Sequence, residues 1–271
     1  MPENDRLLVE RIPVDDRGSS LGLVTLNRPA EMNPLDWDTG LELGRIFDEL
    51  SADPMVRVVA ITGAGKAFSA GGDMKKYQVL QRDTVDFPQF LEDLHRIFAR
   101  ISQQPKPFVA LVNGIAVAGG IELMLSCDLA IASASAKIGD AHLPFGQMGG
   151  GGVLTLLPRA VGPARARELI FSGRLLTPEE ALDWGLVSKV VADDQLRAAG
   201  IEFAAEVAKK SPLAVANAKS VLNAALWDGT GVHQGLRLER EVTARYCLTS
   251  EDAPEGLEAF AGKRRPQFTG R

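Results

Sequence analysis

The stretch from Val112 to Asp128 reads VNGIAVAGGIELMLSCD and joins a strand pattern to a helix pattern. An apolar, largely β-branched run at 108–112 leads into it and predicts a buried strand. Asn113-Gly114 predicts a turn, and the apolar residues from Ile121 onward predict a helix. Glycines at a helix start leave backbone N–H groups uncovered, so this turn offers donors at the positive end of the helix dipole.

Gly119 and Gly120 open this predicted helix, and Glu122 follows in its first turn. N–H groups at such a place can stabilise a developing oxyanion, and a carboxylate beside them can move a proton. The structural alternative is that the glycines only allow close packing and that Glu122 only complements the helix dipole. In isolation the stretch favours the structural alternative, and features elsewhere in the chain change that balance.

A second glycine-rich turn, 70–73, also follows a predicted buried strand, at 56–62. Each turn can present a backbone N–H group at the end of a sheet where a strand finishes. Two such donors, a carboxylate and a downstream histidine would suit acid/base chemistry around a polarised carbonyl. The run 149–152 is all glycine, which indicates either a flexible loop or a wall where the backbone approaches a ligand closely.

Composition excludes several classes of protein. The 271 residues are 45% hydrophobic and 24% charged, which is typical of a globular chain with a sizeable core. A formal net charge of −5 argues against a general nucleic-acid surface. No apolar run reaches membrane-spanning length, and the first ten residues carry acids where a signal peptide has bases, so we expect a cytoplasmic protein that does not bind membranes.

Metal, phosphate-loop and serine-hydrolase motifs are missing from the sequence. Two cysteines allow no cysteine-based metal site, and the three histidines have no metal-ligand spacing. The segment 62–67 looks like a phosphate loop, but Ala60 stands where the P-loop pattern needs glycine and Ala67 where it needs serine or threonine. No Gly-x-Ser-x-Gly elbow occurs, and we therefore expect no metal and no such nucleophile.

Periodicity predicts strands alternating with helices up to about residue 191 and helices alone afterwards, hence an α/β core at 1–192 and a helical C-terminal region at 193–271. The expected elements are a hairpin at 7–12 and 21–27, a helix at 36–50 capped by Asp36, a helix from Asp73 interrupted by Pro88, loops at 63–72 and 137–148, a helix at 164–171, a capping box at 177–180, and C-terminal helices with breaks at 211–212, 227–231 and 253–254.

Motifs in a fixed order cover almost the whole chain. They are LNRP (26–29), KAFSAGGD (66–73), VNG (112–114), GGIEL (119–123), CD (127–128), AVG (160–162), TPEEA (177–181), WGLV (184–187), SEDA (250–253) and KRRPQF (263–268). Together they resemble the enoyl-CoA hydratase/isomerase (crotonase) family. The resemblance implies a spiral of ββα units, a helical trimerisation region that often forms a dimer of trimers, a CoA thioester as substrate, and no cofactor.

The resemblance also implies roles for single residues. By motif position, the backbone N–H groups of Gly72 and Gly119 hold the thioester oxygen. The adenine of CoA is expected against the loop that contains Ala70, within a CoA-binding segment that includes Lys66 and Asp73. Glu122 matches the first catalytic glutamate of the hydratases, whereas His142 holds the position of the second.

This departure at His142 leaves the reaction open, and the structural alternative is that His142 only hydrogen-bonds the chain around Asp140. The first hypothesis is reversible addition of water across the α,β double bond of an enoyl-CoA, with His142 as the acid/base partner of Glu122. The second is a thioester or C–C hydrolase, or an isomerase, that uses His142. The third is a protein that binds a CoA ester without turnover, and RNA binding is disfavoured by the net charge of −5.

Apolar residues predict two further features. Those near the glycine turns are expected either to line an acyl pocket or to pack in the core: Met74, Tyr77, Val79, Leu80, Leu143, Phe145 and Met148. The helices after residue 193 carry more apolar residues than packing on one side requires, which predicts a trimer or hexamer. They include Leu213, Val215, Val221, Leu222, Leu236, Leu238, Tyr246, Leu248 and Phe260.

Overall fold

The computed structural model describes residues 6–271 and contains two sheets. The larger sheet has the spatial order β1 (Leu7–Pro13), β2 (Ser20–Leu26), β3 (Val56–Gly63), β5 (Phe108–Val112), β7 (Leu129–Ser133) and β9 (Lys189–Val191). The smaller sheet has the order β4 (Ala67–Ser69), β6 (Ile115–Val117) and β8 (Lys137–Gly139). β1 and β2 form the predicted antiparallel hairpin, and the other neighbouring strands are parallel.

From β3 onward, consecutive strands alternate between the two sheets, with helices between the pairs. The chain therefore winds as a spiral of ββα units, which confirms the predicted α/β fold class. The helices of this part are α1 (Trp37–Ala52), α2 (Met74–Leu80), α3 (Asp86–Gln103), α4 (Gly119–Ser126), α5 (Val153–Val161), α6 (Pro163–Ser172) and α7 (Pro178–Asp183).

The larger sheet is buried on both faces. In β5, Phe108 and Ala110 join a core with α1, α3 and α4, whereas Val109 and Leu111 join a second core beneath α8 (Leu196–Ala208). Successive side chains of a strand point to opposite faces, and a parallel sheet covered on both faces has nearly continuous apolar strands. This explains why the apolar runs of the sequence marked these strands clearly.

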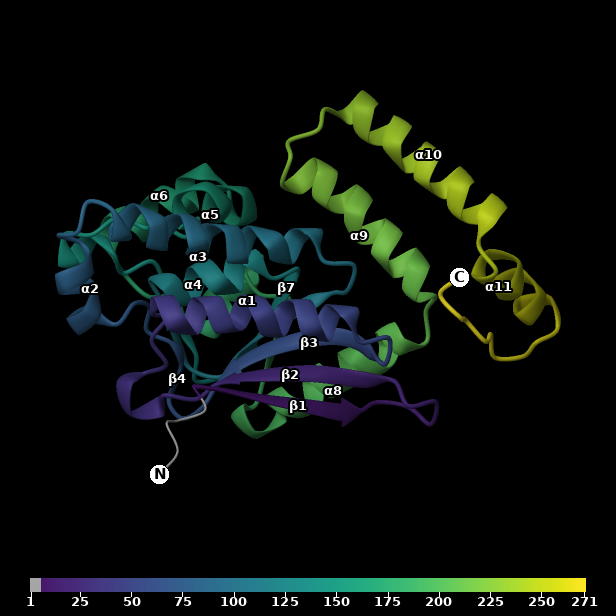
Figure 1. Cartoon of the computed structure of the whole chain (residues 1–271), viewed down its shortest axis with the longest axis horizontal. Coiled ribbons are helices and arrows are strands. Elements are labelled where there is room, and N and C mark those ends of the chain that lie inside the picture. Colours follow the sequence, from purple (N-terminus) through teal and green to yellow (C-terminus); the bar gives the residue numbers. More distant parts are fainter. Residues whose placement is uncertain (1–5) are drawn as a thin grey trace.

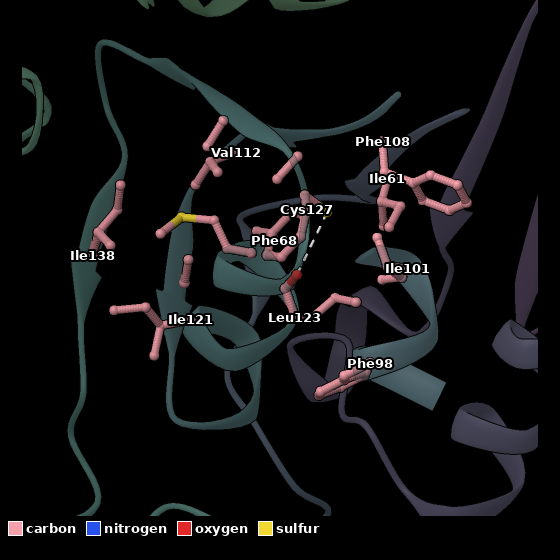
Figure 2. Close-up of a cluster of buried hydrophobic side chains, with 14 of the residues drawn as sticks. Ile61, Phe68, Phe98, Ile101, Phe108, Val112, Ile121, Leu123, Cys127 and Ile138 are labelled. Carbon is pink, nitrogen blue, oxygen red and sulfur yellow. Dashed lines mark hydrogen bonds between the residues drawn. The ribbon is translucent and has the colours of Figure 1, made fainter. Parts of the chain in front are cut away.

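Figure 2 shows how the first core holds α4, the helix that begins at the two glycines. Ile121 and Leu123 are fully buried among Phe68, Phe98 and neighbouring side chains, so the residues on both sides of Glu122 are anchored in the core. The thiol of Cys127 donates a long hydrogen bond to the Leu123 carbonyl, and burial raises its pKa. α4 is thus a rigid support for Glu122.

Two predicted loops contain strands, and both predictions were wrong at this point. β4 lies within 63–72 and β8 within 137–148, which also holds a short 3-10 helix at Leu143–Phe145. Three-residue strands show too little alternation to be detected from sequence. They form here because β4, β6 and β8 pair with one another across long sequence separations.

Proline was also misinterpreted in two places. Pro88 lies in the first turn of α3, and Pro254 lies in the first turn of α11 (Asp252–Ala261), so neither proline breaks its helix. The first N–H groups of a helix have no intrahelical partner, and proline is therefore tolerated there. The Asp36 cap of α1 and the Thr177 capping box of α7 were predicted correctly.

The C-terminal helices leave the spiral. α8 packs on β2, β3, β5 and β7, while α9 (Pro212–Leu226) and α10 (Val232–Thr249) form a hairpin that extends away from the sheets (Figure 1). Of the helices within residues 6–271, none combines the length and the apolar character that crossing a membrane requires. The domain boundary at 192/193 stays a prediction.

A buried lysine attaches α9 to the spiral. The Lys219 ammonium donates to the carbonyls of Ile101 and Lys106, each at 2.9 Å, and to Oδ2 of Asp128 at 2.7 Å. The same Asp128 oxygen accepts the N–H of Phe108 at 2.7 Å. Lys219 is 7% exposed, so every donor of its ammonium is matched by an acceptor in the protein.

Lys219→Met is expected to lower the free energy of unfolding by about 3 kcal/mol, because it leaves Asp128 charged and unpaired. Adding Asp128→Asn should restore part of the loss by removing that charge. Urea denaturation at fixed protein concentration measures both. Lys189→Met is the control, since Lys189 forms an exposed pair with Glu202 and its loss should cost about 1 kcal/mol or less. Equal effects of the two lysine substitutions would contradict the prediction.

Candidate active site

A cavity of about 170 Å³ lies where the two glycine turns meet. It brings together five of the residues singled out from the sequence: Ala70, Gly72, Gly119, Glu122 and His142. Its apolar wall includes Met74, Tyr77, Phe145 and Met148, as predicted for an acyl pocket, and Phe90, Leu91 and Leu94 of α3, which were not predicted. The ionisable side chains that line it are those of Tyr77, Glu122 and His142.

The two glycine turns are in direct contact. A Cβ on Gly71, whose φ is +93°, would lie 2.6 Å from Cβ of Ala118 and 3.1 Å from the backbone nitrogen of Gly119. Only glycine fits this approach, because the space is missing and a positive φ strains other residues. Within residues 6–271, the N–H groups of Gly72 and Gly119 donate no hydrogen bond, so both are available to one oxygen atom in the cavity.

Glu122 is a buried carboxylate held by the glycine run. Its Oε1 accepts the N–H of Gly151 at 2.8 Å and that of Val153 at 3.3 Å. Burial raises the pKa of the Glu122 carboxyl, and nearby His142 and the two backbone donors only partly oppose this. Oε2 accepts no hydrogen bond from the described chain, which leaves it for a substrate or water. The backbone of the glycine run 149–152 therefore lies close to Glu122, which agrees with the second of the two interpretations of this run.

His142 faces the same cavity from the loop after β8. Its Nδ1 lies 2.7 Å from Oδ1 of Asp140, and its side chain is 13% exposed. Burial opposes protonation, but the Asp140 hydrogen bond and the negative charge of Glu122 outweigh it and raise the pKa of His142. A Cβ on Gly149 would lie 2.9 Å from Oε1 of Glu122 and 3.4 Å from Cε1 of His142, so the carboxylate and the ring flank one point of the backbone.

Residues 16–271 match the family model described as Enoyl-CoA hydratase/isomerase. The chain belongs to this family. It is 38% identical over 259 residues to a probable enoyl-CoA hydratase of Rhizobium meliloti (strain 1021), covering 96% of this chain and 98% of that one. It is also similar to a crotonyl-CoA hydratase of Syntrophomonas wolfei, with 33% identity over 93% of this chain and 96% of the relative.

Solved structures support the same family. The crystal structure of an enoyl-CoA hydratase from Bacillus anthracis superposes with a TM-score of 0.89 at 32% identity, covering 97% of this chain and 99% of that one. The enoyl-CoA hydratase/isomerase fold therefore extends over the spiral and the C-terminal helices alike.

Other predicted residues lie outside this cavity. Lys66 is exposed in the turn before β4, and Asp73 caps α2 while accepting from Arg28 at 3.1 Å. Both stay predictions for the CoA segment. Val79, Leu80 and Leu143 do not line the cavity, and the other two histidines, His95 and His233, are exposed. No group of three metal-ligating side chains occurs within 6–271.

Gly151→Ala is expected to lower kcat about a hundredfold, the typical cost of displacing a catalytic group by about 1 Å. The added Cβ would lie 2.7 Å from Oε2 of Glu122 and force the carboxylate to move. Steady-state kinetics on an enoyl-CoA thioester measures the effect. Gly235→Ala, where an added Cβ meets no atom within 4 Å, is the matched control. A normal kcat for Gly151→Ala would mean that the position of Glu122 tolerates this shift.

Sequence reasoning missed the backbone groups that hold Glu122. The N–H groups that hold Glu122 come from residues 151 and 153, about 30 positions away along the chain, and backbone donors leave no residue-type signal. A hydrogen bond of His142 to the chain around Asp140 was predicted only as the structural alternative, and the structure contains it, from Nδ1 to Oδ1 of Asp140 at 2.7 Å. The α3 side chains of the acyl wall had no signal beyond helical periodicity.

Proposed function

We propose that this protein adds water across the α,β double bond of an enoyl-CoA thioester. The observation that carries the proposal is one cavity in which two free N–H groups, Glu122 and His142 meet. Family membership supports the substrate class, since the relative from Syntrophomonas wolfei is named a crotonyl-CoA hydratase. CoA forms part of the substrate, and no further cofactor is included in the proposal.

The chemistry follows from the geometry. The N–H groups of Gly72 and Gly119 bind the thioester oxygen and stabilise the negative charge that it gains when water attacks Cβ. Water loses a proton and Cα gains one, and these two transfers need two acid/base groups. Glu122 and His142 provide them, and the apolar wall holds the acyl chain. Lys66, Ala70 and Asp73 are proposed to bind the CoA part.

Two measurements test this function. Purified protein is assayed against crotonyl, long-chain enoyl, aromatic and cyclic-ketone CoA thioesters, and acetoacetyl-CoA binding is measured at equilibrium. We expect hydration of at least one enoyl thioester and binding of acetoacetyl-CoA but not of the free acid. Failure of acetoacetyl-CoA to bind at millimolar concentration would refute the assignment of the cavity.

A second candidate is a hydrolase or isomerase of the same fold, favoured by His142 in place of a second glutamate. Such an enzyme would release CoA or a carbon fragment, or would shift the double bond without uptake of water. The product of the same screen distinguishes these reactions. Binding without turnover of any thioester would instead identify a CoA-ester-binding protein.

We also propose that the chain assembles as a trimer or a dimer of trimers. α10 and α11 expose large apolar side chains, among them Leu248 at 84% and Phe260 at 86%. Apolar surface of this kind usually marks an interface. Sedimentation at micromolar concentration is expected to give three or six times the chain mass of 29.1 kDa. A monomer would contradict the proposal.

A further inference from the structure

Asp140 is a buried carboxylate with an unusual set of partners. It is 1% exposed, and within residues 6–271 its side chain accepts hydrogen bonds only from His142, through Nδ1 at 2.7 Å and the backbone N–H at 3.4 Å. Burying a charge without a cation is costly. A carboxylate that served only to stabilise the loop would be expected to reach a lysine, an arginine or several backbone donors, as Asp128 does through Lys219.

The backbone of Asp140 reaches the oxyanion turn. Its carbonyl accepts the N–H of Ala118 at 2.8 Å, and Ala118 directly precedes Gly119. Ala118 and Ala141 both have a positive φ, of +50° and +54°, which is strained in residues other than glycine. Such strain in non-glycine residues persists only where the surroundings enforce it, and it gathers at functional sites. One residue therefore connects the predicted oxyanion donor to the predicted acid/base histidine.

The hydrogen bond decides which nitrogen of His142 carries the hydrogen. A carboxylate oxygen only accepts, so Nδ1 donates and Nε2 keeps its lone pair. Nε2 makes no hydrogen bond within the described chain, and His142 lines the cavity. The groups whose charge acts on His142 are Asp140 in its own loop and Glu122 from α4, while Tyr77 of α2 faces Glu122.

We propose that Asp140 is a positioning residue that keeps His142 in the Nδ1–H tautomer and so makes Nε2 the base for the attacking water. This proposal rests on the hydratase function proposed above. Nε2 takes a proton as the water oxygen bonds to Cβ, and the π electrons move onto the thioester oxygen held by Gly72 and Gly119. Cα then receives a proton from the Glu122 carboxyl, and the proton on His142 returns to Glu122 to complete the cycle.

The proposal makes Glu122 the acid and His142 the base, whereas the cavity lining alone does not show which of the two residues has which role. Burial of the Glu122 carboxyl favours its protonated, proton-donating form, and the hydrogen bond to Asp140 strengthens His142 as a base. Without Asp140, the ring would be free to place its hydrogen on Nε2, which would then donate to water instead of accepting from it.

Asp140→Asn tests the proposal, because asparagine keeps the shape and the backbone contact to Ala118, removes the charge and replaces one acceptor oxygen by a donor NH₂ group. We expect kcat to fall about a hundredfold with little change in acetoacetyl-CoA affinity. Asp140→Asn combined with His142→Ala should be no slower than His142→Ala alone. Asp193→Asn is the control, since Asp193 is exposed and, within residues 6–271, its side chain accepts a hydrogen bond only from the backbone N–H of Ser135.

¹⁵N NMR of histidine-labelled protein provides a readout that does not need turnover. The signal of His142 is the one missing in His142→Ala, and the wild type should show hydrogen on Nδ1. Asp140→Asn should lower the pKa of His142 and reduce the Nδ1–H population. An Nε2–H tautomer in the wild type, or an unchanged tautomer and kcat in Asp140→Asn, would overturn the proposal. If these NMR changes occur in a protein that hydrates no thioester, the function fails and the positioning role stands.

Discussion

Glu122→Gln is expected to lower kcat about a thousandfold, within the range for the loss of an acid/base group. Glutamine keeps the shape and can still accept the N–H of Gly151, so the cavity and the affinity for acetoacetyl-CoA should change little. In the proposed mechanism the Glu122 carboxyl gives a proton to Cα, and an amide cannot replace it in that role. Single-turnover kinetics on the best thioester of the screen measures the chemical step directly.

The same substitution is expected to stabilise the folded protein at neutral pH. Burial raises the pKa of Glu122 above its ordinary value of 4.5, so ionisation is harder in the folded than in the unfolded chain. Ionisation of buried Glu122 therefore lowers the stability of the folded protein. This loss is absent below the ordinary pKa of 4.5 and grows as the pH rises towards the raised pKa of the folded state. Glu122→Gln should therefore raise the Tm at pH 8 but not at pH 4. Lower stability together with lower activity would instead point to a structural role.

His142→Ala is expected to lower kcat at least about a hundredfold while acetoacetyl-CoA still binds nearly as in the wild type. In the proposed mechanism the imidazole contributes a proton transfer, and the N–H groups of Gly72 and Gly119, which are proposed to bind the thioester, remain in place. His142→Glu should hydrate crotonyl-CoA faster than His142→Ala, because glutamate restores a second carboxyl. His95→Ala, at an exposed site on α3, is the control and should behave as wild type.

Stability gives an independent check on His142. Because its pKa is raised in the folded state, its protonation stabilises the fold below the ordinary value of 6.5, and this contribution is lost as the pH rises through the raised pKa. The Tm difference between wild type and His142→Ala should therefore be larger at pH 6 than at pH 9. A wild-type kcat in His142→Ala would make His142 structural and would favour a one-carboxylate isomerase.

Local patterns were sufficient for the larger sheet and most helices. Phe108–Val112 is apolar throughout because both faces of its strand are covered, and the capping residues Asp36 and Thr177 bind N–H groups only three positions away. β4 and β8 could not be predicted in the same way, because three-residue strands depend on partners from distant parts of the chain.

For the site, motif order identified Gly72, Gly119, Glu122 and His142, and the fold places all four around one cavity. The residue type at a motif position shows which chemical group the side chain or backbone can provide. It does not state the pKa of that group, its hydrogen-bond partner or its free atoms, because these depend on burial and on contacts between distant segments. The raised pKa of Glu122 and the N–H groups that hold its Oε1 therefore could not be predicted from the motif and are known only from the structure.

The chain's order of apolar runs, glycine turns and capping residues is enough to specify a ββα spiral with a helical C-terminal region, because each of these signals acts over a few neighbouring residues. Only the folded chain decides that Gly149 and Gly151 press against Glu122 and that the Asp140 carbonyl meets Ala118. These contacts join segments about 20 to 30 residues apart, and they exist because the core holds the two sheets and α4 in one arrangement.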